Sequence, residues 1–262
     1  MPREISSAPR MGAPDISELI LDKFYRTLKE RLKNDVLIIS AGTSALVAAW
    51  KLAERGYKVT VLEEAGYLGG SLWVGESFVS HTIVTSPAER ILEELGVEYE
   101  EVSAGVYWVN GPLLAAKLIT RALEAGAWFL NFASVDDVLI ERGRVAGLLV
   151  RWSPVQGPVG MRAKVVIDAS GRDAVALRRL VERGLVDVRA FRRPGIELRG
   201  ETGELIVENT MEVYPGLIVS GVTVAEMLGI AEIGPGVGPL LLSGEKAAME
   251  ASRLVEAERE SL

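Results

Sequence analysis

A short loop of small residues between two apolar runs has the composition of a phosphate-binding turn. Dinucleotide-binding folds place glycine at three positions of this turn, and here those positions hold Ser40, Gly42 and Ala45. The middle glycine is the one that lets the backbone approach a pyrophosphate closely. Glu63 follows at about the 20-residue distance at which an acid binds the ribose hydroxyls. The pattern predicts a nucleotide site, and it is equally compatible with a β-α-β unit that binds no ligand.

The flanking segments must bring this turn and this acid to one edge of a sheet. Apolar runs at residues 36–39 and 59–62 predict two strands, and residues 46–55 predict a helix between them. This order of elements predicts a parallel pair. Further buried strands are predicted at residues 165–171 and 216–221, and a last long helix at residues 238–258. The predicted fold class is therefore α/β, a Rossmann-like, flavoprotein-type domain with a central parallel sheet and helices on both faces.

The middle of the chain predicts a smaller antiparallel β region, near residues 97–151, embedded in this domain. Residues 97–109 have the pattern of a hairpin, and residues 127–135 and 137–151 that of strands, the latter turning at 141–144. Helices are expected to start at Pro87 and at Gly111-Pro112 and to stop at Gly96 and Gly126.

The first residues of the chain look different from the rest. Residues 1–14, with three prolines, predict a flexible tail, and residues 15–262 predict a single domain. Asp15 is placed to cap a helix that runs to about residue 33. The apolar face of this helix is expected to pack on the domain or on a neighbouring subunit; it consists of Ile16, Leu19, Ile20, Phe24 and Leu28.

The remaining residues able to do chemistry favour structural roles. His81 is the one imidazole in the sequence and cysteine is absent, so we expect no thiolate chemistry and no metal site built on His81. Asp168 and Asp173 could bind a cation or a ribose, or could end a strand and cap the next helix, and we favour the second interpretation. Four tryptophans are predicted to pack rather than to stack on a ligand: Trp73, Trp108, Trp128 and Trp152.

Composition excludes several classes of partner. The 262 residues carry 29 Lys and Arg against 36 Asp and Glu, and the basic residues are scattered, which argues against nucleic acid. No apolar stretch reaches the roughly 18 residues that a membrane helix needs, and residues 1–14 lack a signal-peptide core. We expect a cytoplasmic protein. A single Gln, four Asn and no Cys are typical of a thermophilic source.

Longer motifs are more specific than the loop. They are Leu62-Glu63 followed by Gly69-Gly70 and Trp73, Ser86-Pro87-Ala88-Glu89, Asn209-Thr210-Met211-Glu212-Val213-Tyr214-Pro215-Gly216, and Leu241-Leu242-Ser243-Gly244. In order and spacing, from residue 15 to 258, they resemble the thiamine thiazole synthase family, especially its archaeal, sulfide-dependent branch. The resemblance implies formation of an adenylated thiazole for thiamine from NAD, glycine and sulfide with ferrous iron. It also implies a homo-oligomer, an octamer built from rings.

The resemblance implies a small-molecule nucleotide partner, NAD or an adenylated derivative. The positions that would contact it are Ser40, Ala41, Gly42, Ser44, Glu63, Glu64, Gly70, Ser71, Val135 and Val222. We expect weak binding, because the family's first and third loop glycines are Ser40 and Ala45, and Glu64 replaces an arginine. Ser71 likewise stands where the family has a third consecutive glycine.

The sequence also departs from the family where iron and glycine would bind. The family's first ligand segment, His-x-Asp-Pro, corresponds to residues near 155–158, which hold neither His nor Asp. In the second segment Arg172 replaces the histidine, and a guanidinium cannot coordinate a metal. Glu232 replaces the arginine that binds the glycine carboxylate, a reversal of charge that would repel it. The sequence thus predicts that the iron ligands and the glycine site are lost.

Three functional hypotheses from different classes remain. The chain is a thiazole synthase with an altered site, or an FAD- or NAD-dependent oxidoreductase, or a non-catalytic binding or assembly partner. Many flavin enzymes have an aspartate directly after the glycine that ends the later strand. Here Val222 follows Gly221, which weakens the flavin interpretation.

Overall fold

Two parallel strands and the helix between them form the centre of the structure, as the sequence predicts. In this computed structural model, which describes residues 11–74, 80–152, 157–188, 202–230 and 236–260, β1 (Lys33–Ile39) pairs in parallel with β2 (Val59–Glu63). The connecting helix, α2 (Thr43–Glu54), is buried along most of its length. Small side chains such as Ala45, Ala48 and Ala49 allow this, because they let neighbouring elements approach closely.

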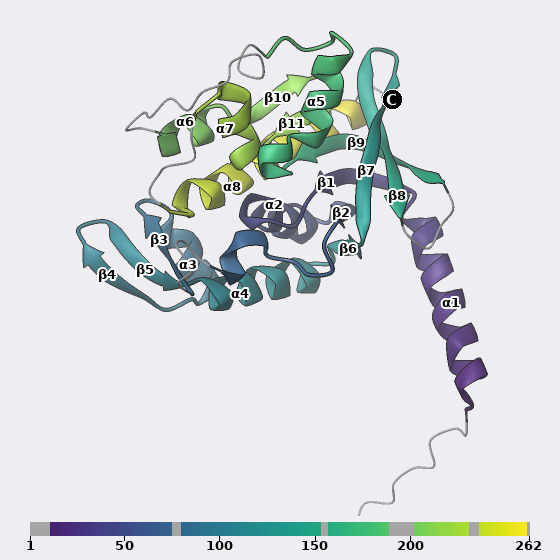
Figure 1. The fold of residues 1–262 in the computed structure, drawn as a ribbon, viewed down its shortest axis with the longest axis horizontal. Coiled ribbons are helices and arrows are strands. Elements are labelled where there is room, and N and C mark those ends of the chain that lie inside the picture. Colours follow the sequence, from purple (N-terminus) through teal and green to yellow (C-terminus); the bar gives the residue numbers. More distant parts are fainter. Residues whose placement is uncertain (1–10, 75–79, 153–156, 189–201, 231–235, 261–262) are drawn as a thin grey trace, which may run out of the picture. The chain divides into compact units, whose positions relative to one another are not determined.

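The main sheet extends on both sides of this pair (Figure 1). The strand order is β10-β11-β9-β1-β2-β6. β6 (Trp128–Asn131) is parallel to β2, β11 (Leu217–Val219) is parallel to β9 (Pro158–Asp168), and β10 (Met211–Tyr214) is an antiparallel edge strand. The hairpin of β7 (Ala133–Glu141) and β8 (Arg144–Trp152) pairs with the first half of β9. The prediction of an α/β fold with a mainly parallel central sheet is confirmed.

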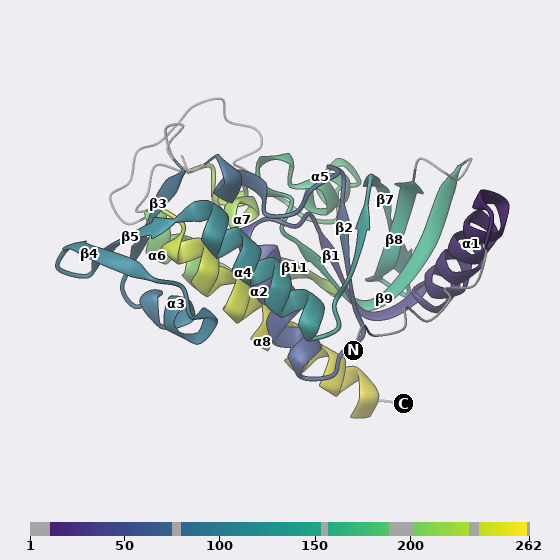
Figure 2. The same cartoon turned by 90° about the horizontal axis from the view of Figure 1, so that it is seen from below.

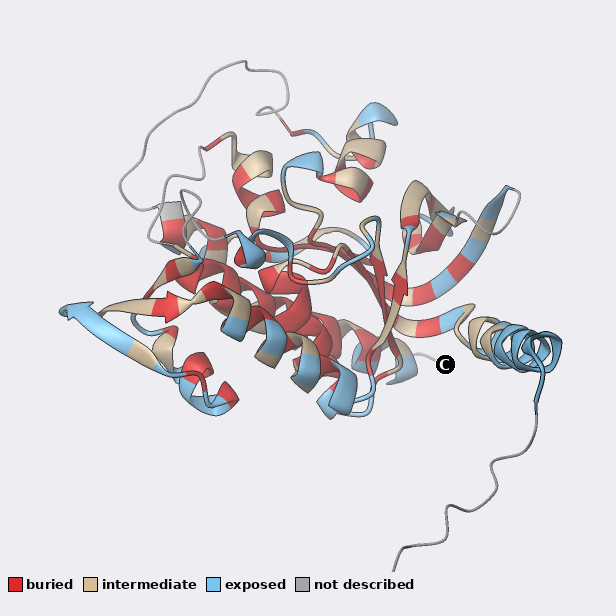
Figure 3. Ribbon diagram, turned by 60° about the horizontal axis from the view of Figure 1, so that its bottom comes forward, coloured by how far each residue is buried: buried red, intermediate tan, exposed pale blue. Residues whose placement is uncertain are grey.

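Helices α2, α4 (Gly111–Glu124) and α8 (Gly238–Glu260) pack together against one face of the sheet (Figure 2). The close approach of α8 to α2 requires Gly244, because a Cβ there would lie 2.3 Å from the carbonyl oxygen of Ser44. α5 (Val175–Glu182) packs against β7 and β9, and α6 (Thr202–Glu208) packs against α7 (Val222–Leu228) and α8. Figure 3 shows that buried residues concentrate in the central strands and in the helices packed on them.

A second, three-stranded antiparallel sheet has the order β3-β5-β4. The predicted hairpin is confirmed as β4 (Tyr99–Ser103) and β5 (Val106–Asn110), and α3 (Glu89–Leu95) ends at Gly96 as predicted. The sequence did not predict β3 (His81–Thr85), which pairs with β5. The antiparallel strands expected within residues 97–151 thus divide between this small sheet and the β7–β8 hairpin of the main sheet.

One strand was predicted where the structure has two. Residues 127–135 were expected to form a single strand, but β6 ends at Asn131 and β7 begins at Ala133. Phe132 between them has a φ of 58°, a left-handed conformation that extended strands exclude. The chain turns there from the edge of the parallel sheet into the antiparallel hairpin, whose own turn falls at Arg142-Gly143 as predicted.

By contact the chain divides into two units, residues 1–33 and 34–262. The first contains α1 (Ala13–Glu30), which is amphipathic and has no buried residue. Asp15 contributes to the cap of this helix, but from inside its first turn rather than before it: Gly12 is the N-cap, and the Asp15 carboxylate accepts the N–H of Gly12 at 2.8 Å. The helix also ends before residue 33, because Lys33 already belongs to β1. Of the predicted tail, residues 1–10 lie outside the described residues.

Candidate nucleotide site

The turn from β1 into α2 leaves an open space above the helix N-terminus. Gly42 is the N-cap, with φ −74° and ψ −175°, and a Cβ added to it would meet no atom within 4 Å. No side chain caps the helix there. The first N–H groups of a helix have no intrahelical acceptor and the helix dipole is positive at this end, so an anion such as a phosphate is favoured. Gly42 therefore leaves room for a group that the helix N-terminus attracts.

Ser40 takes the backbone conformation that the usual glycine would supply. Its φ is 72°, and its N–H donates to the carbonyl of Leu62 at 2.7 Å. A non-glycine residue in this left-handed region is strained by roughly 1 kcal/mol or more. The substitution keeps the shape of the turn at the expense of stability.

The Glu63 carboxylate joins the two loops at the ends of β1 and β2. Its oxygens accept the N–H of Ala41 at 2.7 Å and the N–H of Ala65 at 2.8 Å, and the Ser40 hydroxyl donates to it at 3.3 Å. A carboxylate has about four lone-pair positions, so an acceptor remains for a further hydroxyl. From the sequence we predicted that Glu63 contacts the ligand, but not that it also holds the turn in shape. The part of Ala65 could not be predicted from its side chain, because it contributes only its backbone N–H.

The loop after β2 folds back over the same turn. The Gly69 N–H donates to the carbonyl of Ala41 at 2.9 Å, and a Cβ on Gly70 would lie 3.4 Å from the Cα of Gly42. Gly70 begins the short helix η1 (Gly70–Trp73). These contacts bring five of the predicted residues together: Ser40, Ala41, Gly42, Glu63 and Gly70.

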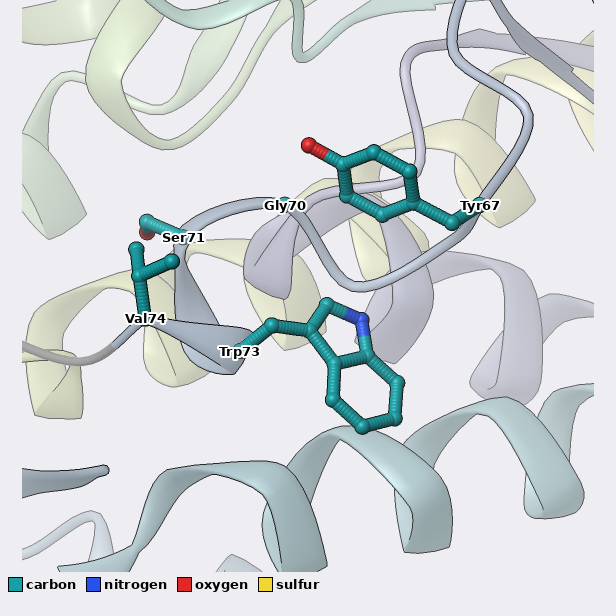
Figure 4. A pocket seen from close by; sticks show the side chains of 5 residues that line it. All are labelled: Tyr67, Gly70, Ser71, Trp73 and Val74. Carbon is teal, nitrogen blue, oxygen red and sulfur yellow. The ribbon is translucent and has the colours of Figure 1, made fainter.

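A pocket of about 430 Å³ opens beside this loop (Figure 4). Its described lining consists of Tyr67, Gly70, Ser71, Trp73 and Val74. Tyr67 is 61% exposed and Trp73 is 40% exposed, although the Trp73 indole N–H donates to the carbonyl of Leu68. The sequence prediction included Gly70 and Ser71 but not Tyr67. An exposed aromatic side chain beside two glycines was the signal that could have found it.

The turn from β11 into α7 reaches the start of α2 from the other side. Gly221 has a φ of 65°, and a Cβ on it would lie 2.3 Å from the hydroxyl oxygen of Ser44. Val222 is the first residue of α7, so it too lies near this turn in sequence. Val135 lies on β7, an element that contacts β2, and is half-buried. Glu64 is exposed, and Glu232 lies outside the described residues.

The acidic residues after β9 have structural partners. Asp168 ends the strand as predicted and is fully buried; it accepts the Ser170 hydroxyl at 2.6 Å and the N–H of Leu177 in α5 at 2.9 Å. Burial raises the pKa of this carboxyl, and its hydrogen bonds oppose that rise. The prediction that Asp173 caps α5 is wrong, because Asp168 and Ser170 accept the N–H groups of its first turns.

The described residues offer no ready set of ligands for a metal ion. They contain no group of three His, Asp or Glu side chains placed to hold a metal. Arg172, which was expected from the resemblance to stand at the family's histidine position, is exposed in η3 (Gly171–Asp173), while residues 155 and 156 lie outside the described part. His81 instead stacks on Trp108 in the small sheet, with ring centroids 4.9 Å apart and planes at 4°.

In the described residues, no helix combines the length and the apolar character needed to cross a membrane.

Comparison with known proteins finds relatives that match this chain over nearly its whole length. The sequence pattern of the Thi4 family matches residues 17–237. The thiamine thiazole synthase of Aeropyrum pernix is 51% identical over 248 residues, 91% of each chain, and that of Thermococcus kodakarensis is 36% identical over 90% of this chain and 96% of the relative.

Solved structures agree with the sequence comparison. The crystal structure of Thermovibrio ammonificans THI4 superposes with a TM-score of 0.88 at 32% identity, covering 94% of this chain and 99% of that one. A geranylgeranyl bacteriochlorophyll reductase-like protein from Thermoplasma acidophilum shares the fold, with a TM-score of 0.57 at 16% identity. This chain therefore belongs to the thiamine thiazole synthase family, as its motifs predict.

Proposed function

We propose that this protein binds NAD or an adenylated derivative of it at the start of α2. The observation that carries the proposal is the open space at Gly42, above a helix N-terminus that no side chain caps. There the first N–H groups of α2 would hold the pyrophosphate, and the free acceptor capacity of Glu63 would hold the adenosine ribose. When bound, NAD supplies the adenylated ribose from which the family builds its thiazole.

We also propose that the chain does not carry out the family's complete reaction. Capture of ferrous iron needs gathered ligands, and the described residues lack them. Capture of glycine needs a cation where the sequence has Glu232. The best-supported function is thus that of a nucleotide-binding family member without thiazole synthesis, acting as a homo-oligomer in the cytoplasm.

Calorimetric titration of the purified protein with NAD and with ADP-ribose tests the binding. We expect saturable heat with weak affinity, because Ser40 strains the turn and Glu64 places a negative charge near the phosphates. About 1 mM ligand would half-fill even a weak site whose Kd is about 1 mM. Absence of heat and of a thermal shift at this concentration would therefore contradict the proposal. Mass spectrometry of ligand released from the protein then separates NAD from FAD.

The Gly42→Ala variant locates the site. The added methyl fits the unliganded protein, so the free energy of unfolding should change by less than about 1 kcal/mol. The same methyl would overlap a phosphate, which costs about 1–3 kcal/mol and weakens ADP-ribose binding about tenfold or more. Gly160→Ala on β9 is the matched control, because that Cβ also meets open space. Equal binding by both variants would place the nucleotide elsewhere.

A further inference from the structure

Three fully buried hydroxyl groups meet where α6, β11 and α8 converge. Ser243 in α8 lies 2.6 Å from the hydroxyl oxygen of Thr210 and 3.0 Å from that of Ser220. Thr210 and Ser243 come from two sequence motifs, residues 209–216 and 241–244, to which the nucleotide site gives no role. We call these three residues the hydroxyl cluster.

Counting donors fixes the direction of every hydrogen bond in the hydroxyl cluster. The Thr210 hydroxyl donates to the carbonyl of Ile206 at 2.8 Å, so toward Ser243 it can only accept. Ser243 therefore donates to Thr210. Both acceptor positions of the Ser243 oxygen are then taken, one by the hydroxyl of Ser220 and one by the N–H of Gly221 at 2.8 Å. No hydrogen or lone pair of Ser243 remains unused.

The bond to Gly221 links the hydroxyl cluster to the candidate nucleotide site. Gly221 has φ 65° and ψ −138°, a conformation essentially confined to glycine, and a Cβ there would lie 2.3 Å from the Ser44 hydroxyl. The Gly221 turn is thus hydrogen-bonded to Ser243 on one side and packs closely against Ser44, in the first turn of α2, on the other. Movement of this turn would change the surroundings of the N–H groups that face a phosphate.

We propose that Ser243 is a positioning residue for nucleotide binding, which holds the Gly221 turn against Ser44 and so fixes the first turn of α2. The inference rests on the proposed nucleotide site. This positioning role differs from a general contribution of Ser243 to the core. Loss of a core contact would lower the stability of the protein, but it would not act selectively on the Gly221 turn or on the affinity for the nucleotide.

The test compares Ser243→Ala with Ser252→Ala. Ser252 is a buried serine of the same helix; it donates to the carbonyl of Ala248 at 2.9 Å and accepts from Arg55 at 3.0 Å. Both variants should lower the melting temperature. Only Ser243→Ala leaves the Gly221 N–H without an acceptor, so only it should weaken ADP-ribose binding, by about tenfold, and speed amide exchange at residues 220–224 and 43–46.

A second pair protects the test if Ser243→Ala fails to fold. Thr210→Val removes the acceptor that orients the Ser243 hydroxyl; it should show both effects in the same direction but smaller, because Ser243 still accepts the N–H of Gly221. Thr210→Ser keeps the hydroxyl and should match the wild type. Unchanged affinity and exchange in Ser243→Ala and Thr210→Val would overturn the inference. If the wild type binds no ADP-ribose, the proposed function fails, and the exchange rates of the unliganded variants alone decide whether Ser243 holds the turn.

Discussion

At the scale of single residues, the turn between β1 and α2 combines a glycine-like backbone with a serine side chain. Ser40 keeps the left-handed backbone of the usual glycine, and its hydroxyl offsets part of the strain through Glu63. Gly42 and Gly70 lie where the two loops approach closely, since a Cβ on Gly70 would be 3.4 Å from the Cα of Gly42. The turn therefore has a backbone conformation typical of glycine, but it carries a serine side chain that contacts Glu63.

Ser40→Gly should stabilise the protein by about 0.5–1 kcal/mol, because relief of the left-handed strain outweighs the lost hydroxyl contact and the added freedom of the unfolded chain. Ser40→Ala keeps the strain and loses the contact, so it should be less stable than the wild type by about 0.5 kcal/mol. Chemical denaturation of all three proteins measures the order. A glycine variant less stable than the wild type would contradict the prediction, because the lost Ser40–Glu63 contact and the added freedom of the unfolded chain would then outweigh the relief of strain.

At the scale of elements, α8 is the helix on which several others depend. It packs on α2 through Gly244, carries Ser243 of the hydroxyl cluster, and is tied to α3 by the pair of Arg90 and Glu245, whose Nη1 and Oε1 atoms lie 2.8 Å apart. The hydrogen bond from Arg90 lowers the pKa of Glu245 below its ordinary value of 4.5, against the opposing effect of burial.

Glu245→Gln should lower the free energy of unfolding at pH 7 by about 0.5–1 kcal/mol, a figure that includes solvent screening of this partly exposed pair. Because the folded pKa is lowered, the stability from Glu245 is fully present above pH 4.5 and is lost as the pH falls through the folded value. The difference between variant and wild type should shrink accordingly in denaturation measured from pH 7 downward. A difference that grows toward acid pH would reverse the assigned sign.

The control for this variant is Glu182→Gln, which breaks a more exposed pair with Arg179 inside α5. Its loss at pH 7 should be smaller, within about 0.5 kcal/mol, because it joins no separate elements and both side chains are well solvated.

At the scale of the whole molecule, the apolar face of α1 is unburied within its own unit. Leu19 is 57% and Ile20 is 62% exposed. Such a face on a helix without buried residues is typical of an interface, so we expect a homo-oligomer. Replacing Leu19 and Ile20 by Lys should reduce the mass seen by light scattering. Glu18→Lys, with the same change in net charge on the opposite face, should not, and a monomeric wild type would contradict the expectation.

Thiazole synthesis is likewise a property of the whole molecule, because it needs the nucleotide, iron and glycine to be bound together. Anaerobic incubation with NAD, glycine, sulfide and ferrous iron should yield no adenylated thiazole if, as we propose, the residues for iron capture and for glycine capture have both changed. For this reason Glu232→Arg alone should not restore activity. Chromatography of the products is the measurement, with an active synthase of the family as the positive control. Multiple turnovers by the unmodified chain would refute the proposed loss.

The sequence alone determined the β1-α2-β2 unit, the last helix and the family, because apolar runs record which segments are buried and long motifs record ancestry. It also placed Gly42 and Glu63 at the ends of two neighbouring strands, on one edge of the sheet. Local patterns do not record which distant segment a strand meets, so β3 joining β5 and the break at Phe132 were decided by tertiary packing. For the same reason the meeting of Thr210, Ser220 and Ser243 is visible only in the structure: a buried hydroxyl needs partners, and the fold alone supplies them.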